Sequence, residues 1–259
     1  MAIFNHQDGQ YLEIDGAQIY VETKGLESGP PLVFLHGGLG SIADFEQLLP
    51  LLQDRFRLIG MDSRGQGRST MGNAPLTYER MAQDVRAVLR HLNPGPATLI
   101  GHSDGGIIAL RLAVAHAPEV SGIVTIGAHW QLAQNDPTRA LLARVTPESW
   151  RHMFPDSHAQ YNAHNPEPDF ERITRDVVHL WLDAGADGYP GETVREITCP
   201  LLIIRGDEDR LVSRENTFEL AERVPGAQLL NLPFAGHSVQ DDQPAQLAWA
   251  LQNFLKVQP

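Results

Sequence analysis

The chain has 259 residues, 42% of them apolar, and a formal net charge of −12 at pH 7. This length and apolar fraction suffice for one sizeable domain with room for an insertion. The acidic balance argues against a nucleic-acid partner, because phosphate backbones are bound by clustered Lys and Arg. The charge therefore indicates solubility or, more specifically, attraction of a cationic substrate.

Targeting signals and cysteines give further expectations. No stretch approaches the roughly 20 apolar residues of a membrane span. Residues 1–8 contain neither a basic nor an apolar segment, so we expect no secretory signal peptide. Cys199 is the single cysteine, which excludes an intrachain disulfide and fits a reducing compartment. We expect a cytoplasmic protein without a membrane partner, cofactor or metal.

The first predicted elements are two strands, Tyr11–Ile14 and Ala17–Thr23, joined by the turn pair Asp15-Gly16. Leu32–Leu35 is a short apolar run, typical of a strand buried on both faces, and it ends at His36-Gly37-Gly38. A helix over residues 42–52 and a strand over residues 55–61 are predicted next.

A second helix begins at Thr77, whose hydroxyl is the expected N-cap, and stops before Asn93–Pro96. Its apolar residues recur at helical spacing: Met81, Val85, Val88, Leu89 and Leu92. The later predictions are strands over residues 97–100, 122–126, 201–204 and 228–232, and helices over residues 107–115 and 244–255.

The alternation of strands and helices breaks between about His129 and Arg195, a region rich in Pro, His and Trp. The helices predicted there are irregular and cover residues 139–144, 147–154 and 170–183. We interpret the region as a helical lid, with additional core helices as the alternative. The expected architecture is α/β, with a mostly parallel sheet flanked by helices. Residues 1–128 and 196–259 would form the core, and residues 129–195 the lid.

The most informative motif is Gly101-His102-Ser103-Asp104-Gly105-Gly106, which follows an apolar run and opens an apolar helical stretch. A strand that turns sharply into a helix lifts one side chain to the sheet edge, here the hydroxyl of Ser103. Glycines beside it allow unusual backbone angles and close backbone approach. The motif predicts a nucleophilic serine.

A serine hydroxyl needs a base, and the base needs an orienting acid. His237 is the candidate base, because it follows the last predicted strand and the loop Pro233–Gly236. Asp209 is the favoured acid, since it lies in the loop after the preceding strand, and Asp207 is the alternative. Two backbone N–H groups, of Asp104 and of Gly38, are the predicted oxyanion hole.

Several segments carry a family resemblance that covers nearly the whole chain. They are Leu35–Gly38, the elbow at Ser103, Asp62–Ser69, Gly206–Asp209 and Gly236-His237. The chain resembles the α/β-hydrolase fold superfamily, in its esterase, haloperoxidase-like and C–C hydrolase branch, and matches its order of nucleophile, acid and base. A serine at the elbow sets it apart from haloalkane dehalogenases and epoxide hydrolases, which use an aspartate.

Asp104 carries a second resemblance. Gly-x-Ser-Asp-Gly-Gly is similar to the elbow of the valacyclovirase (biphenyl hydrolase-like) group, which implies that this carboxylate helps to recognise the amino group of an ester substrate. The alternative is that the Asp104 side chain bonds within its loop and only its N–H is used. Burial and the partners of the carboxylate distinguish these interpretations.

The leading hypothesis is a cofactor-free serine hydrolase of a small carboxylic ester. The alternatives are a C–C bond hydrolase of a ring-cleavage dienoate, a catalytically silent small-molecule receptor, and a haloperoxidase-type side activity. The oligomeric state stays open. The candidate substrate-binding residues, each of which can equally be packing, are Gly37, Asp104, His129, Trp130, Trp150, Phe154, Trp181 and Phe234.

Overall fold

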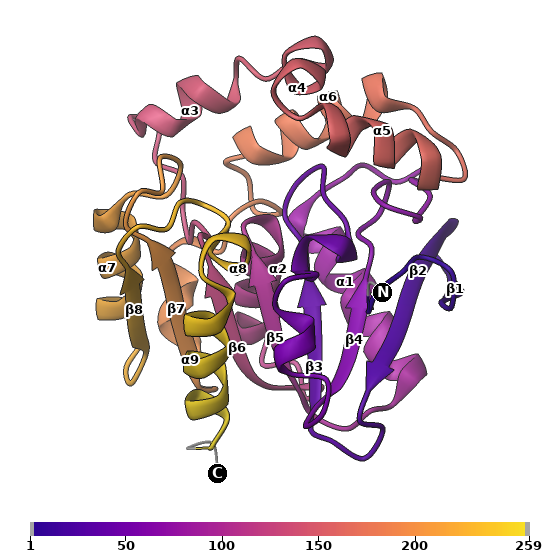
Figure 1. The fold of residues 1–259 in the computed structure, drawn as a ribbon. Helices are drawn as coiled ribbons and strands as arrows, with labels where there is room; N and C mark the ends of the chain where they lie inside the picture. The colour runs from indigo at the N-terminus through magenta and orange to yellow at the C-terminus, as the bar shows by residue number, and fades with distance from the viewer. Residues whose placement is uncertain (1–2, 257–259) are drawn as a thin grey trace.

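The apolar runs form the strands of one sheet in a computed structural model, which describes residues 3–256 (Figure 1). The first two residues of the N-terminal segment considered above lie outside this part. The sheet has eight strands in the order β1-β2-β4-β3-β5-β6-β7-β8. Their bounds are β1 Gln10–Ile14, β2 Ala17–Gly25, β3 Pro31–Leu35, β4 Arg57–Met61, β5 Ala97–His102, β6 Val120–Ile126, β7 Leu201–Gly206 and β8 Gln228–Leu232.

The strand directions confirm the predicted mostly parallel sheet. β2 pairs antiparallel with β1 and with β4, whereas every pair from β4 through β8 is parallel. The β1–β2 turn has positive φ angles at Asp15 (49°) and Gly16 (74°), as a two-residue hairpin requires. Parallel strands place their carboxyl ends at one edge, so the loops after β3, β5, β7 and β8 meet there.

The inner strands are buried on both faces. Along β3, Leu32 and Phe34 belong to one apolar cluster, while Val33 and Leu35 belong to the other. Successive side chains of a strand point to opposite faces, so each inner strand contributes to two cores. The short apolar run therefore forms the expected kind of strand.

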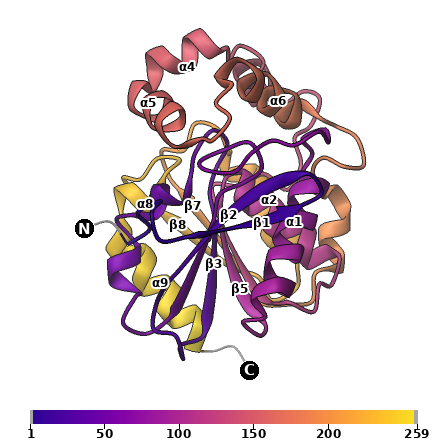
Figure 2. The same ribbon diagram turned by 90° about the vertical axis from the view of Figure 1, so that its right-hand side faces the viewer.

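Helices cover both faces (Figure 2). One cluster packs under α1 (Tyr78–Leu92), α2 (Asp104–Val114) and α7 (Arg214–Arg223). The other packs under α8 (Val239–Asp242) and α9 (Pro244–Lys256). Thr77 caps α1 as predicted, because its hydroxyl accepts a hydrogen bond from the backbone N–H of Arg80 at 3.1 Å.

The helix predicted over residues 42–52 is wrong. Two short 3₁₀ helices, η1 (Ile42–Phe45) and η2 (Leu49–Leu51), occupy this segment. Pro50 lies inside η2 and has no N–H, so it interrupts the hydrogen bonds of a continuous α-helix. The apolar residues still reach the core, because Ile42, Phe45, Leu48 and Leu49 are fully buried.

Four α-helices lie between β6 and β7 in the chain, and they are placed above the carboxyl ends of the strands (Figure 1). We call them the helical layer: α3 Pro137–Leu142, α4 Pro147–Met153, α5 Pro155–His164 and α6 Phe170–Leu182. α6 buries six residues and joins the apolar cluster of α1 and α2, whereas α4 and α5 bury none. The short helix η3 (Gly191–Glu196) follows and packs against α2 and α7. Within residues 3–256, no helix combines the length and apolar character needed to cross a bilayer.

Candidate active site

Ser103 lies at the junction of β5 and α2 in a strained backbone conformation. Its φ of 49° and ψ of −114° are uncommon for a residue with a Cβ. Close backbone packing accompanies this turn, since a Cβ added at Gly105 would lie 2.0 Å from the carbonyl oxygen of Leu35. The Ser103 side chain is half-buried and makes no capping hydrogen bond to α2. This is the geometry of a serine presented by a strand-to-helix elbow.

Asp209 and His237 meet at the same edge of the sheet. Asp209 Oδ2 lies 2.9 Å from His237 Nδ1, and Asp209 Oδ1 accepts hydrogen bonds from the backbone N–H groups of Leu211 and Val212 at 2.8 and 3.0 Å. Burial opposes ionisation of this carboxyl, but the hydrogen bond and charge of His237, with these N–H groups, hold the pKa of Asp209 below its usual value.

The alternative acid, Asp207, lies apart from the histidine. Its Oδ1 accepts hydrogen bonds from Arg214 Nε and Asn231 Nδ2, each at 2.8 Å. Asp207 therefore braces the loop after β7.

His102 ties the loop of His237 to the elbow, a contact that sequence reasoning missed. His102 Nε2 donates to the carbonyl oxygen of His237 at 3.1 Å, and the two rings lie 4.9 Å apart. Burial, followed by the nearby His237, lowers the pKa of His102 to about 3, so it stays neutral. Gly127 completes the packing, because an added Cβ would lie 3.0 Å from His237 Nδ1.

The turn after β3 lies beside the start of α2. The N–H of Gly105 donates to the carbonyl oxygen of His36 at 3.1 Å, and a Cβ added at Gly37 would lie 3.2 Å from the Cβ of Ser103. Within residues 3–256, the N–H groups of Gly38 and Asp104 have no hydrogen-bond acceptor. Two unpaired N–H groups beside a strained serine can stabilise a developing oxyanion.

The Asp104 carboxylate is buried, with 2% of the residue exposed. Its Oδ1 accepts hydrogen bonds from Tyr78 Oη at 2.8 Å and Trp181 Nε1 at 3.0 Å, and Oδ2 lies 3.0 Å from the same indole nitrogen. Burial raises the pKa of Asp104 to about 6, although these hydrogen bonds lower it in part. Neither Tyr78 nor the role of Trp181 as a donor was predicted, because both contacts join distant segments.

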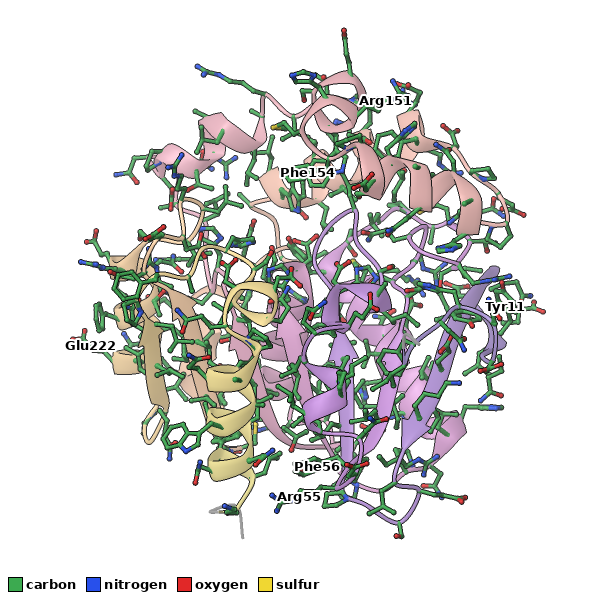
Figure 3. The ribbon with its side chains drawn as sticks, viewed as in Figure 1. Tyr11, Arg55, Phe56, Arg151, Phe154 and Glu222 are labelled. Carbon is green, nitrogen blue, oxygen red and sulfur yellow. The ribbon has the colours of Figure 1, made fainter. Side chains whose placement is uncertain are left out.

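The aromatic candidates divide between the site and the core. Trp181 contacts Asp104 through its indole nitrogen. The ring centroids of Trp150 and Trp181 lie 6.2 Å apart. Phe154, labelled in Figure 3, lies at the junction of α4 and α5, and its ring is tilted against that of Trp150 with 4.6 Å between the ring centroids. Trp130 instead has no exposed surface. Its indole donates to a backbone carbonyl of α7, and it therefore packs in the core.

Two candidates remain, one buried and one at the surface. His129 is buried, and its ring lies 6.3 Å from that of Tyr189. Phe234 is 84% exposed and has a positive φ of 62°, so its side chain projects into solvent. A cavity of about 460 Å³ lies at the opposite edge of the sheet, where Figure 3 labels Arg55 and Phe56, and contains none of the predicted site residues.

The model of the alpha/beta hydrolase family matches residues 32–251. The chain belongs to this family. It is 31% identical to a non-heme haloperoxidase of Rhodococcus erythropolis, over 87% of this chain and 91% of the relative. It is 29% identical to the 2-(acetamidomethylene)succinate hydrolase of Mesorhizobium japonicum, over 97% and 96%.

The fold of this α/β-hydrolase is also found in solved structures. A thermophilic esterase from Thermogutta terrifontis superimposes with a TM-score of 0.76 at 21% identity, over 96% of this chain and 100% of that structure. At this identity the likeness concerns the fold. The relatives carry different activities in their names, so the family indicates a hydrolase and the site must indicate the substrate.

Proposed function

We propose that this α/β-hydrolase cleaves a small carboxylic ester through an acyl-enzyme on Ser103. His237 accepts the serine proton as Oγ attacks the ester carbonyl, and Asp209 holds the imidazole through Nδ1–H. The tetrahedral oxyanion accepts hydrogen bonds from the N–H groups of Gly38 and Asp104. Its collapse breaks the bond to the alcohol oxygen, which takes the proton from His237.

The second half of the reaction repeats these steps with water. His237 removes a proton from water as its oxygen attacks the acyl carbon, and the bond to Ser103 Oγ then breaks with return of the proton to the serine. The carboxylic acid is released. We propose that residues 129–195 serve as a lid, with Trp150, Phe154 and Trp181 beside the acyl group.

One observation carries this proposal. The strained Ser103 lies at the sheet edge that also holds the Asp209–His237 pair and two N–H groups without acceptors. Backbone strain at a polar residue is costly and concentrates at functional sites. A silent receptor would need neither the strain nor the ordered acid–histidine pair.

The test is hydrolysis of p-nitrophenyl acetate by Ser103→Ala. We expect kcat/KM to fall by at least about 1,000-fold, because a serine hydrolase without its nucleophile retains only oxyanion and binding effects. Ser121→Ala is the matched control and should keep the parent activity, since this serine is the second residue of β6, at the amino end of the strand. Full turnover by folded Ser103→Ala, verified by circular dichroism, would refute the mechanism.

A substrate panel addresses the scissile bond. Acyl esters of increasing length and a coloured ring-cleavage dienoate are compared on the same preparation. Ester turnover that exceeds dienoate turnover supports the ester proposal. Dienoate cleavage dependent on Ser103, with poor ester turnover, would favour the C–C alternative.

A further inference from the structure

The Asp104 carboxylate joins three elements that are distant in sequence. Asp104 begins α2, Tyr78 begins α1 and Trp181 lies in the last turn of α6. The carboxylate accepts the phenol O–H of Tyr78 and the indole N–H of Trp181. This side chain therefore bonds α6 to the core, in addition to bonds from other helices of the layer such as that from Ser157 Oγ to the carbonyl oxygen of Leu39 at 3.1 Å.

The same contacts line the turn after β3 at Gly37 and Gly38, which we call the oxyanion turn. A Cβ added at Gly38 would lie 2.6 Å from Asp104 Oδ2 and 2.7 Å from Cζ2 of Trp181. The carboxylate and the indole thus form the wall against which Gly38 packs. Only glycine fits there without displacing them.

A second hydrogen bond holds the backbone of Trp181. Tyr189 Oη donates to the backbone carbonyl of Trp181 at 2.8 Å, and the ring of Tyr189 lies 5.4 Å from that of Tyr78. Burial keeps the pKa of Tyr78 well above its usual value, so its hydroxyl stays a donor. The position of Trp181 is therefore set by both its side chain and its backbone.

We propose that Asp104 is a positioning residue that ties α6 to the oxyanion turn, so that the placement of Trp181 and of the Gly38 N–H depends on its carboxylate. This inference rests on the proposed function, in which the N–H groups of Gly38 and Asp104 stabilise the oxyanion. It differs from the amine-anchor interpretation, because both carboxylate oxygens already accept hydrogen bonds from the protein.

The chemistry of the carboxylate explains why an amide is a partial substitute. A carboxylate is an acceptor on both oxygens, and can receive the phenol and the indole together. In Asp104→Asn the amide oxygen still accepts a hydrogen bond. The NH₂ group is a donor, so it cannot accept from the phenol or the indole that it faces. In Asp104→Ala all these bonds are lost.

The experiment measures kcat and KM on p-nitrophenyl acetate and on valine ethyl ester. Asp104→Ala should lower kcat on the acetate ester about 100-fold, the effect of roughly 1 Å of misplacement. Asp104→Asn, Trp181→Phe and Tyr78→Phe should each lower it about tenfold, the value of one hydrogen bond to a charged group. KM should stay within about threefold, because the oxyanion bonds form in the transition state.

Two further measurements separate positioning from general damage. The double variant Asp104→Asn/Trp181→Phe should lose less than the product of the single losses, because both changes act on the same contact. Backbone amides of α6 should exchange with deuterium faster in Trp181→Phe than in the parent chain. Tyr161→Phe is the control, since its hydroxyl accepts only the N–H of Asp169 within the helical layer, and it should keep the parent kcat.

The outcomes distinguish this inference from the proposed function. Parent values of kcat in Trp181→Phe and Tyr78→Phe, with Ser103→Ala inactive, would overturn the positioning role alone. A rise in KM for the valine ester in Asp104→Asn, with the acetate ester unaffected, would instead assign Asp104 to amine binding. If Ser103→Ala stays active, the proposed mechanism fails. Unchanged amide exchange of α6 in Trp181→Phe would then also overturn the link between α6 and Asp104.

Discussion

A buried carboxylate without a cationic partner costs folding free energy. The groups that face Asp104 are the hydroxyl of Tyr78 and the indole of Trp181, with the charge of His237 further away. Within the described residues, no Lys or Arg forms an ion pair with this carboxylate. The hydrogen bonds from Tyr78 and Trp181 therefore have to offset the cost of burying this carboxylate.

The pH dependence of stability tests this view of Asp104. Burial raises its pKa to about 6 from 3.8, so the folded chain binds the proton more tightly than the unfolded chain. The Asp104 carboxyl therefore lowers the stability of the parent chain as the pH rises from 3.8 to about 6. Asp104→Asn lacks this contribution. Between pH 4.5 and pH 8, the unfolding free energy of the parent chain should fall by about 2 kcal/mol relative to that of Asp104→Asn.

Urea denaturation of both chains at several pH values measures this difference. Because it compares the two chains at each pH, other titrating groups cancel. A difference that is constant with pH would contradict the raised pKa.

The individual residues of the elbow, acid and base could be proposed from sequence because each follows a strand with local turn residues. The partners of Asp104 could not, since Tyr78 and Trp181 are 26 and 77 residues away and carry no local signal. His102 was likewise hidden, because its bond to the loop of His237 spans 135 residues. Local sequence patterns predict residues that lie at turns. They do not predict contacts between segments that are distant in the sequence.

At the scale of elements, α2 packs on the sheet through glycines. A Cβ added at Gly105 would lie 2.0 Å from the carbonyl oxygen of Leu35, and one at Gly106 would lie 2.5 Å from the Cβ of Ala128. Backbone atoms cannot move aside as a flexible side chain can. The close approach of α2 to β3 therefore depends on the absence of side chains.

Gly105→Ala should destabilise the fold by about 3 kcal/mol, at the upper end of the cost of overpacking. Gly95→Ala is the control, because an added Cβ there meets nothing within 4 Å and only its φ of 85° is unfavourable. It should cost about 1 kcal/mol. Thermal and urea unfolding of both variants measure these values, and equal losses would contradict the packing argument.

Elements differ in how well their patterns predicted them. α1 has a capping threonine and apolar residues at helical spacing, so both its start and its buried face were anticipated. α5 (Pro155–His164) buries no residue and has no apolar face, so nothing in its sequence marked it. The prediction of one helix over residues 42–52 was wrong for another reason. It followed the spacing of the apolar residues and gave too little weight to Pro50.

At the scale of the whole molecule, the sheet separates two apolar clusters. The helices of the helical layer contribute unequally to one of these clusters. α6 contributes Phe170, Ile173, Val177, Leu180 and Trp181 to the cluster of α1 and α2. The alternation of strands and helices predicted the sheet, but the unequal attachment depends on contacts that no periodicity encodes. The layer is therefore attached mainly through α6, which also carries the bond to Asp104.

This arrangement predicts a hierarchy of opening that native-state hydrogen exchange can measure. Amides of α4 and α5 should exchange through local opening, because these helices bury no residue. Amides of β3 and β5 should exchange only with global unfolding, since both strands lie in the centre of the sheet. Amides of α6 should be intermediate, as six of its residues are buried.

Low concentrations of urea should then accelerate exchange in β3 and β5 strongly but leave α4 and α5 nearly unaffected, because local opening exposes little surface. Equal protection and equal urea dependence across all these elements would instead mean that the helical layer unfolds together with the sheet.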